Sequence, residues 1–484
     1  MYLQFNINYQ ERGETPFSTG REYRLDDPPA TAKIYFGKVP PSARKGKIKV
    51  RFFLRRENFL FVSPREYPAV YRRDERGIET NNPSPILPLW STKKPEGGMR
   101  QRQSEARGRI GQPAVGEALR RLKPRKIGDG VLSITLFSSM YHSRTYTVES
   151  VTSGHPDKVC DQISDAILDE CVRQDPMSRV AVETFGSHDI LVIGGEVSTR
   201  AKVDYEAIAR GVYKTIGYPD TLRVLVHVAE QSPDIAQGVD TGGAGDQGIM
   251  YGYATDETPE LMPKAVLQVH RLAEGLENLR RSGKFPWIKP DGKTQITVFN
   301  GALQSVLVSV QHDENIDNGS IRNALIENLI RPVIGTCDGI EILVNPTGKF
   351  VQGGFAADTG LTGRKIMVDT YCGLAPHGGG AFSGKDATKV DRSAAYMARF
   401  VAKNIVREGK AKKCLVSVAY AIGRAEPLMI EAVDENGRDI THHAKQFDFR
   451  PVAIIERLGL RRPVFLRTAA YGHFGRPGFP WEEV

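Results

Sequence analysis

The chain has 484 residues, of which 40% are hydrophobic and 25% are charged, a composition typical of globular proteins with two or more domains. It contains no run of about eighteen apolar residues, and its first residues lack the pattern of a signal peptide, so we expect a cytoplasmic protein without a membrane span. The five cysteines form no CxxC pair, which argues against a disulfide framework and against a zinc site built from thiolates.

Positive charge is concentrated in the first 140 residues. The net charge of the whole chain is +9, and residues 1–140 alone contain 27 Lys and Arg against 14 Asp and Glu. This segment has many Pro, Arg and Gly residues and few periodic apolar stretches, a composition typical of disordered extensions. A nucleic-acid-binding arm is the alternative, although no recognisable module is present. We expect residues 1–140 to be a basic extension that is disordered or non-native and begins upstream of a second plausible initiator, Met140.

Periodic apolar segments begin after Met140 and predict an α/β fold of the α+β type. The first unit is expected to contain strands 145–149, 180–185, 190–198 and 222–228 and helices 156–172 and 205–216. The second is expected to contain strands 249–253, 295–299, 306–310 and 341–344 and helices 264–281 and 321–334. A less regular third copy would contain strands 365–370, 415–421 and 428–432 and helices 386–406 and 451–458.

The repeated order of elements predicts three similar β-α-β-β-α-β units. Each would be a mixed sheet covered by helices on one face, and packing of the units would bury those helices. We place the N-terminal unit at residues 141–240, the central unit at 241–352 and the C-terminal unit at 353–484.

A short strand and the first helix flank the segment SGHPDK, residues 153–158. Pro156 suits the first position of a helix, which places His155 at the N-cap and Asp157 in the first turn. A histidine at this place can donate to a phosphate or to a departing oxygen, and a purely structural role is an equal alternative.

The segment GAGDQG, residues 243–248, matches the pattern GxGxxG. It follows a polar loop and leads into a strand, so the strand-before and helix-after context of a dinucleotide fold is missing. With Gln231 to Thr241, these glycines indicate a flexible loop that could close over a substrate.

Two further basic segments precede expected strands. Asp291 and Lys293 are expected in a turn, and Arg364 and Lys365 are expected just after a glycine-rich stretch. Each pair alone is typical of ordinary surface.

The segment HGGGAFSGKD, residues 377–386, nearly matches a phosphate-binding loop. Gly379, Gly384 and Lys385 reproduce GxxxxGK, but Asp386 stands where Ser or Thr would hold magnesium. Glycines let the backbone approach an anion, and a helix starting at Asp386 would offer free N–H groups. An ordinary glycine-rich turn is the alternative.

The lysines of this segment favour phosphate binding. Lys385 and Lys389 would share one face of the first helical turn, with Asp391 close by as a candidate magnesium ligand. Lysines at a helix start oppose the helix dipole, so an anion would be needed to compensate them.

In this order, the motifs GHPDK, GAGDQG, FVQGGFAADTGLTGRK, HGGGAFSGKD and KVDRSAAY resemble the S-adenosylmethionine synthetase family. The resemblance runs from about Tyr146 to the end of the chain. It implies three α/β units with approximate threefold symmetry, and homodimers, often paired into homotetramers, with active sites between subunits. It also implies synthesis of S-adenosylmethionine from ATP and L-methionine, a step of one-carbon metabolism in the cytoplasm, followed by hydrolysis of triphosphate to pyrophosphate and phosphate.

The resemblance also implies a set of site residues. ATP contacts would come from His155, Asp291, Gly292, Lys293, Lys349, Phe350, Asp358, Arg364, Lys365, Ala381 and Lys385. Methionine would lie near Glu196, Gln231, Asp358 and Lys389. Two Mg²⁺ ions would be held by Asp157 and Asp391 with the phosphates, and K⁺ would lie near Glu183. Asp246 would lie near the adenosine and methionine. The expected catalytic residues are His155, Lys293, Arg364 and Lys385.

The implied chemistry is an in-line attack of the methionine thioether on C5′ of ATP. A thioether has no proton to lose, so no general base is needed and the protein positions the reactants and neutralises charge. His155 would donate to the oxygen that bridges ribose and triphosphate. The alternatives are a generic ATPase or kinase that uses residues 378–385 and a non-catalytic nucleic-acid binder that uses residues 1–140.

Overall fold

The computed structural model describes residues 145–219, 221–230 and 242–484, together with short strands before residue 138. The chain divides into two compact units, Met1–Ser138 and Ser139–Val484, which we describe separately. The strands of the first unit are β1 (Tyr2–Tyr9), β2 (Lys33–Ile34), β3 (Gly46–Phe53), β4 (Phe59–Leu60), β5 (Lys126–Ile127) and β6 (Gly130–Val131). They form three pairs, β1 with β3, β2 with β4 and β5 with β6. The other residues of the expected extension lie outside the described part.

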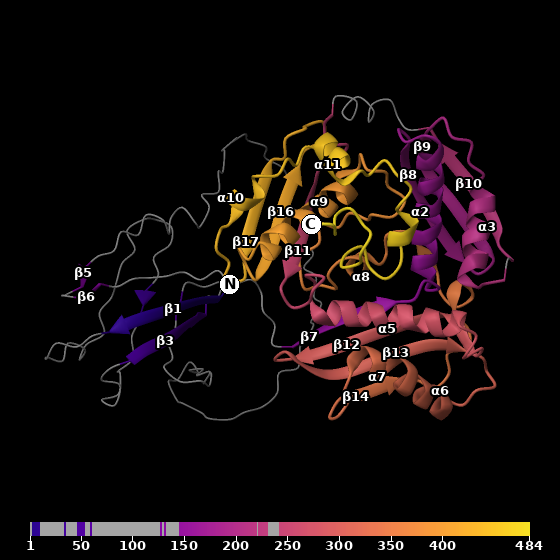
Figure 1. The fold of residues 1–484 in the computed structure, drawn as a ribbon, viewed down its shortest axis with the longest axis horizontal. Helices are drawn as coiled ribbons and strands as arrows, with labels where there is room; N and C mark the ends of the chain where they lie inside the picture. The colour runs from indigo at the N-terminus through magenta and orange to yellow at the C-terminus, as the bar shows by residue number, and fades with distance from the viewer. Residues whose placement is uncertain are drawn as a thin grey trace, which may run out of the picture. The chain divides into compact units, whose positions relative to one another are not determined.

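Three sheets make up the second unit (Figure 1). The first contains, in order, β10 (Arg223–Ala229), β9 (Ile190–Ser198), β8 (Arg179–Ser187) and β15 (Gly360–Leu361). The second contains β14 (Glu341–Val344), β13 (Ala302–His312), β12 (Ile288–Phe299) and β7 (Thr145–Val151). The third contains β11 (Gly248–Thr255), β16 (Lys413–Tyr420) and β17 (Met429–Asp434).

Each sheet packs against one long helix, namely α2 (Pro156–Gln174), α5 (Lys264–Arg281) or α9 (Val390–Arg407). The first thirteen residues of α2 are all buried, and α9 is nearly as buried, so these two helices lie inside the unit rather than on its surface. The remaining helical segments are α3 (Tyr205–Ile216), α6 (Asn318–Leu325), a π-helical turn (Ile326–Ile330), α7 (Arg331–Ile334), α8 (Ile366–Asp369), α10 (Thr441–Ala444), α11 (Pro451–Leu458) and two 3₁₀ turns (Gly354–Ala356 and Leu466–Thr468).

The predicted mixture of helices and strands is confirmed. Among the described residues, no helix is both long enough and apolar enough to cross a membrane.

Strand pairing crosses the predicted unit boundaries. β7 pairs with β12, β15 pairs with β8, and β11 pairs with β16. Each sheet therefore contains a strand that the sequence analysis placed in a different unit. The third sheet is also fully antiparallel, so the expectation of a mixed sheet in every unit is wrong there.

Two predicted elements differ from the structure. Residues 365–370 were expected to form a strand, and the structure has the short helix α8 there, because a short apolar run such as KIMV does not by itself distinguish strand from helix. The helix expected to begin at Asp386 begins at Val390. The backbone of Asp386 donates to the carbonyl of Val180 and its carboxylate accepts from the N–H of Val180 at 2.7 Å, which holds this segment against β8 and delays the helix.

Candidate active site

His155 caps the N-terminus of α2, with Pro156 at the first helical position, as predicted. Its Nδ1 atom accepts a hydrogen bond of 3.2 Å from the backbone N–H of Asp157, and the ring is buried. Because Nδ1 is an acceptor, the proton of the neutral ring lies on Nε2. His155 is thus arranged as a hydrogen-bond donor through Nε2.

Positive charge surrounds this ring. Burial lowers the pKa of His155 to about 2, and nearby positive charges act in the same direction. These charges belong to Lys365, Lys293, Lys158 and Arg364. The ring is therefore neutral at physiological pH, and a bound anion would meet a neutral donor among several cations.

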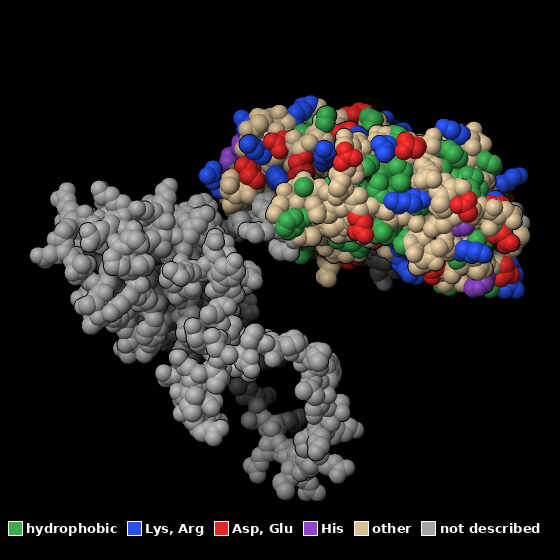
Figure 2. Space-filling view, turned by 90° about the horizontal axis from the view of Figure 1, so that it is seen from below, with side chains coloured by type: hydrophobic (Ala, Val, Ile, Leu, Met, Phe, Trp, Pro, Cys, Tyr) green, Lys and Arg blue, Asp and Glu red, His purple; other side chains and the backbone are tan. Residues whose placement is uncertain are grey.

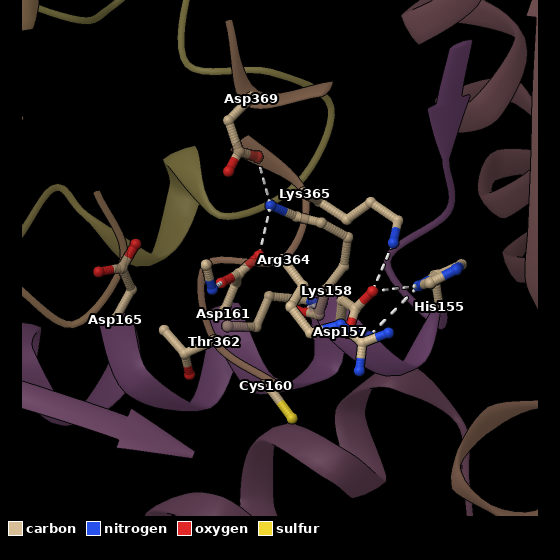
Figure 3. A network of polar contacts seen from close by, with 12 residues as sticks. His155, Asp157, Lys158, Cys160, Asp161, Asp165, Thr362, Arg364, Lys365 and Asp369 are labelled. Atoms are coloured by element: carbon tan, nitrogen blue, oxygen red, sulfur yellow. Dashed lines mark hydrogen bonds and ion pairs between the residues drawn. The ribbon is translucent and has the colours of Figure 1, made fainter. Parts of the chain in front are cut away.

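Arg364 and Lys365 extend toward the start of α2 (Figure 3). The Nζ atom of Lys365 contacts one carboxylate oxygen of Asp157, and Nε of Arg364 lies 3.5 Å from the other. The backbone N–H of Leu361 donates to the same carboxylate at 3.0 Å. The prediction that this pair precedes a strand is wrong, since α8 follows it, but the structure does bring both cations beside His155.

A buried ion cluster links the first turns of α2 to α8. Nζ of Lys158 is 2.5 Å from Oδ1 of Asp369 and 2.8 Å from Oδ2 of Asp161, and all three side chains are buried (Figure 3). Burial alone would lower the pKa of Lys158, but the two carboxylates raise it above its ordinary value. The lysine is therefore charged at physiological pH, and the cluster joins α2 to α8.

Asp291 and Lys293 lie on β12, so the prediction of a turn before a strand is wrong. The strand begins at Ile288 and passes through an irregularity before Gly292. Oδ2 of Asp291 accepts a hydrogen bond of 2.9 Å from the N–H of Gly354, whereas the buried Oδ1 has no hydrogen-bond partner among the described residues. Burial raises the pKa of Asp291 to about 6, although the Gly354 N–H and Lys293 oppose the shift.

The predicted residues Lys349, Phe350 and Asp358 belong to the segment that runs past Asp291. Phe350 is fixed to the end of β13, where its N–H donates to Nε2 of His312 at 3.0 Å. Lys349 and Asp358 are exposed, and the charge of Asp358 acts on Asp291. The structure thus gathers Asp291, Gly292 and this segment on one side of the candidate site.

The glycine-rich segment does not form a P-loop. Helix α8 rather than a strand comes before it, and the segment runs along the edge of β8 instead of opening a helix. Lys385 forms an isolated bridge with Ala181 of β8. The GxxxxGK match therefore gives no structural support to the generic ATPase or kinase alternative.

Both lysines of this segment pair with carboxylates. Nζ of Lys385 is 2.6 Å from Oδ2 of Asp391, and Nζ of Lys389 is 2.5 Å from Oδ2 of Asp386. Lys389 is the N-cap of α9 and Lys385 lies before that helix, so the prediction that they share one helical face is wrong. Asp391, the candidate magnesium ligand, is in the first turn of α9.

Glu183 and Glu196 project from the face of the first sheet that α2 does not cover. On β8, Val182 and Thr184 are buried, and the alternate Glu183 is exposed. Glu196 lies opposite Ala181 on the neighbouring strand β9 and is also exposed. Since Ala181 is the bridge partner of Lys385, both glutamates lie near the glycine-rich segment.

Of the remaining predicted residues, the structure describes Ala381 and Asp246 but not Gln231. A side chain added at Gly363 would come within 2.5 Å of Ala381, so Ala381 lies against the turn that carries Arg364. Asp246 is exposed and accepts from the N–H of Gln247 at 2.7 Å. Gln231 and the rest of the predicted loop to Thr241 lie outside the described residues.

Two buried aspartates of α2, Asp161 and Asp165, were missed by the sequence analysis. Asp161 accepts from the N–H of Gly363, and Asp165 accepts from the N–H of Gly384, both at 2.8 Å. The sequence did contain a signal for them. They are four residues apart in a helix whose apolar positions predicted burial, and a buried carboxylate must find hydrogen-bond partners.

The second unit matches the models of one known protein family. Residues 143–233, 241–350 and 352–483 match the models of the N-terminal, central and C-terminal domains of S-adenosylmethionine synthetase. The chain is 52% identical over 366 residues to S-adenosylmethionine synthase 1 of Rhodopseudomonas palustris, a match that covers 70% of this chain and 95% of that relative. It is 50% identical over 378 residues to the S-adenosylmethionine synthase of Desulforudis audaxviator (70% and 95% covered) and 49% identical over 380 residues to that of Thermus thermophilus (70% and 96%). Three consecutive family models match within the second unit, and the relatives are matched over nearly their full length. The chain therefore belongs to the S-adenosylmethionine synthetase family.

Proposed function

We propose that this chain transfers the adenosyl group of ATP to the sulfur of L-methionine at the cation-lined N-terminus of α2. The observation that carries the proposal is the position of His155, a buried neutral donor to which Lys293, Arg364 and Lys365 bring positive charge. A helix N-terminus with several cations favours a highly charged anion. The triphosphate of ATP is such an anion.

The reaction is an in-line displacement at C5′ of ATP. The methionine sulfur forms a bond to C5′ as the bond from C5′ to the bridging oxygen breaks, which leaves a sulfonium and a triphosphate. Nε2–H of His155 donates to the departing oxygen, and Lys293, Arg364, Lys365 and Lys385 offset the charge that develops on the leaving group. The bound triphosphate is then hydrolysed to pyrophosphate and phosphate.

Contacts to the substrates are part of the same proposal. The free Oδ1 of Asp291 is available to a donor of bound ATP. We assign Gly292, Lys349 and Phe350 to the ATP contacts as well. Ala381 adjoins the turn that carries Arg364. We place the methionine near Glu196, Gln231, Asp358 and Lys389, with Asp246 close to both substrates.

Asp157 and Asp391 fit the role of magnesium ligands. Carboxylate oxygens are the ligands that Mg²⁺ prefers, and it is usually held by one or two carboxylates together with substrate phosphates. No three His, Cys, Asp or Glu side chains of the described residues gather as a metal site, so the phosphates would complete the coordination of two Mg²⁺ ions. Bound Mg²⁺ would neutralise phosphate charge. We assign K⁺ to the surroundings of Glu183.

We propose homodimers, with pairing into tetramers, in which active sites form between subunits. The face of the first sheet opposite α2 carries Glu183 and Glu196 beside the exposed apolar side chains of Phe185 and Leu225, which are 41% and 50% exposed. Figure 2 shows apolar side chains exposed between charged ones on one face of the second unit. A second copy would cover apolar surface of this kind and close the site.

The finer organisation is also a proposal. We assign approximate threefold symmetry to three units at residues 141–240, 241–352 and 353–484, each centred on one of the buried helices α2, α5 and α9. The positions of the family-model matches support these limits. We place the enzyme in the cytoplasm, where ATP and methionine are available.

Replacing Glu183 by glutamine is expected to abolish stimulation of S-adenosylmethionine formation by K⁺ and to leave the Mg²⁺ requirement in place, because one carboxylate charge near the K⁺ is removed. Glu196→Gln, on the adjacent strand, is the matched control. It should raise KM for methionine by about tenfold, the effect of losing one charged hydrogen bond, and keep full K⁺ stimulation. Rates measured with and without KCl test the pair. Loss of K⁺ stimulation in both variants would refute the separate assignments.

Removal of residues 1–139 is expected to leave kcat and the melting temperature of the second unit unchanged. The matches to the relatives cover 95% or 96% of those proteins but only 70% of this chain, so their reaction needs no counterpart of this segment. Steady-state kinetics and thermal melts of the full chain and of a chain beginning at Met140 provide the test. A truncated chain that is folded but inactive would show that the segment takes part in the reaction.

A further inference from the structure

Four aspartates occur at intervals of four residues along α2, so that successive members lie about one helical turn apart. Each accepts a backbone hydrogen bond from a segment distant in the sequence. The pairs are Asp157 with Leu361 at 3.0 Å, Asp161 with Gly363 at 2.8 Å, Asp165 with Gly384 at 2.8 Å, and Asp169 with Phe465 and Leu466, both at 2.9 Å. We call these four residues the aspartate ladder. It fastens three separate loops to one helix.

The two middle aspartates hold comparable turns. Gly363 directly precedes Arg364 and Lys365, and Gly384 directly precedes Lys385. Both glycines have left-handed backbones, with φ of +80° and +79°. A Cβ at Gly384 would lie 1.9 Å from the carbonyl oxygen of Val182, so the loop is pressed against its neighbour and has little freedom.

Each middle aspartate is also paired with a buried cation. Asp161 lies 2.8 Å from Nζ of Lys158, and Asp165 accepts two hydrogen bonds of 2.8 Å from Arg392. Arg392 donates in addition to the carbonyl of Lys385 at 3.0 Å. This one ion pair therefore holds the N–H of Gly384, which precedes Lys385, and the carbonyl of Lys385 itself.

We propose that Asp161 and Asp165 are positioning residues for the reaction. Both carboxylates are 0% exposed and cannot touch a substrate, so they act by fixing the backbone from which Arg364, Lys365 and Lys385 extend. Asp161 sets the turn at Gly363, and Asp165 sets the turn at Gly384. The inference rests on the proposed triphosphate contacts of these cations.

Asp161→Asn is the variant that tests this role without removing the ion cluster. Asparagine has one side-chain oxygen, which can face either the N–H of Gly363 or Nζ of Lys158, whereas the aspartate serves both. Lys158 keeps Asp369 as a partner at 2.5 Å, so the fold should survive. Asp165→Asn is less suited, because Arg392 would lose its carboxylate.

Asp169→Asn is the matched control. Its two oxygens also accept from two separate donors, the N–H groups of Phe465 and Leu466, but that loop carries no predicted site residue. We expect Asp161→Asn to lower kcat by about 10- to 100-fold, the range for a small misplacement of catalytic groups, with KM for methionine unchanged. The control should keep kcat within about threefold of wild type at an equal melting temperature.

A double-mutant cycle in the full chain separates positioning from a general structural defect. In the Lys365→Met background, Asp161→Asn should lower kcat by a clearly smaller factor than it does in the wild-type chain, because one of the two cations that it positions is gone. Wild-type kcat in Asp161→Asn, an equal loss in Asp169→Asn, or fully additive losses in the cycle would each overturn the inference. Full activity of Lys365→Met would remove the proposed role of that lysine, and the inference with it. An inactive Lys365→Met beside a fully active Asp161→Asn would remove the inference alone.

Discussion

Replacing Lys385 by methionine is expected to lower kcat for S-adenosylmethionine formation by up to about 10³-fold. A cation about 4 Å from a phosphate charge contributes about 4 kcal/mol at an effective dielectric constant near 20, before the cost of desolvation, and each 1.36 kcal/mol corresponds to tenfold in rate. The ammonium of Lys385 is anchored by Asp391, at 2.6 Å, on a loop bridged to β8. Methionine keeps most of the length of the side chain and removes the ammonium, with its charge and its N–H donors.

The control for this experiment is Lys389→Met. Lys389 pairs with Asp386, whose carboxylate is bound to β8, and we place this lysine at the methionine end of the site. Lys385→Met should impair both S-adenosylmethionine synthesis and the hydrolysis of added triphosphate, and Lys389→Met should impair mainly synthesis. Both rates are measured on each variant. Equal losses in the two half-reactions for both variants would show that the lysines do not divide the site in this way.

His155→Asn is expected to lower S-adenosylmethionine synthesis by about 10²- to 10³-fold, the usual effect of removing one donor to a developing negative charge. Asparagine is a good N-cap residue, so it can still accept from the N–H of Asp157 and preserve the start of α2. It lacks a donor at the position of Nε2. Hydrolysis of added triphosphate should stay close to the wild-type rate, because that step does not break the C5′–O bond.

Glutamine at position 155 provides the complementary control. The longer amide places an N–H donor near the position of the histidine Nε2, so His155→Gln should recover part of the synthesis that His155→Asn loses. Product formation and triphosphate hydrolysis are measured for both variants under the same conditions. Normal synthesis by His155→Asn, or equal loss of both half-reactions, would contradict the role of His155 as donor to the departing oxygen.

Much of the fold followed from local patterns in the sequence. The bounds of α3, α5, β9, β14 and α11 agree with the periodicity of their apolar residues. The pairing of β7 with β12 and of β15 with β8 did not follow, because residues some 150 apart carry no local signal for which strand they will join. The sequence therefore predicted the elements better than the sheets.

The candidate site was also predicted only in part, because the sequence carries no local signal for contacts between distant residues. The N-cap position of His155 depends only on its neighbours, and the structure has it as expected. The start of α9 was misplaced because a tertiary contact, between Asp386 and Val180, competes with helix formation. The aspartate ladder became apparent only when the distant glycines 363 and 384 were seen to donate to α2.

The reaction itself is tested most directly by product stoichiometry. The full chain is incubated with ATP, L-methionine, Mg²⁺ and K⁺, and S-adenosylmethionine, pyrophosphate and phosphate are quantified over time beside a reaction without methionine. If the site releases the whole triphosphate, the three products form in equal amounts, and almost no phosphate forms when methionine is absent. Release of ADP, or phosphate formation that does not depend on methionine, would contradict it.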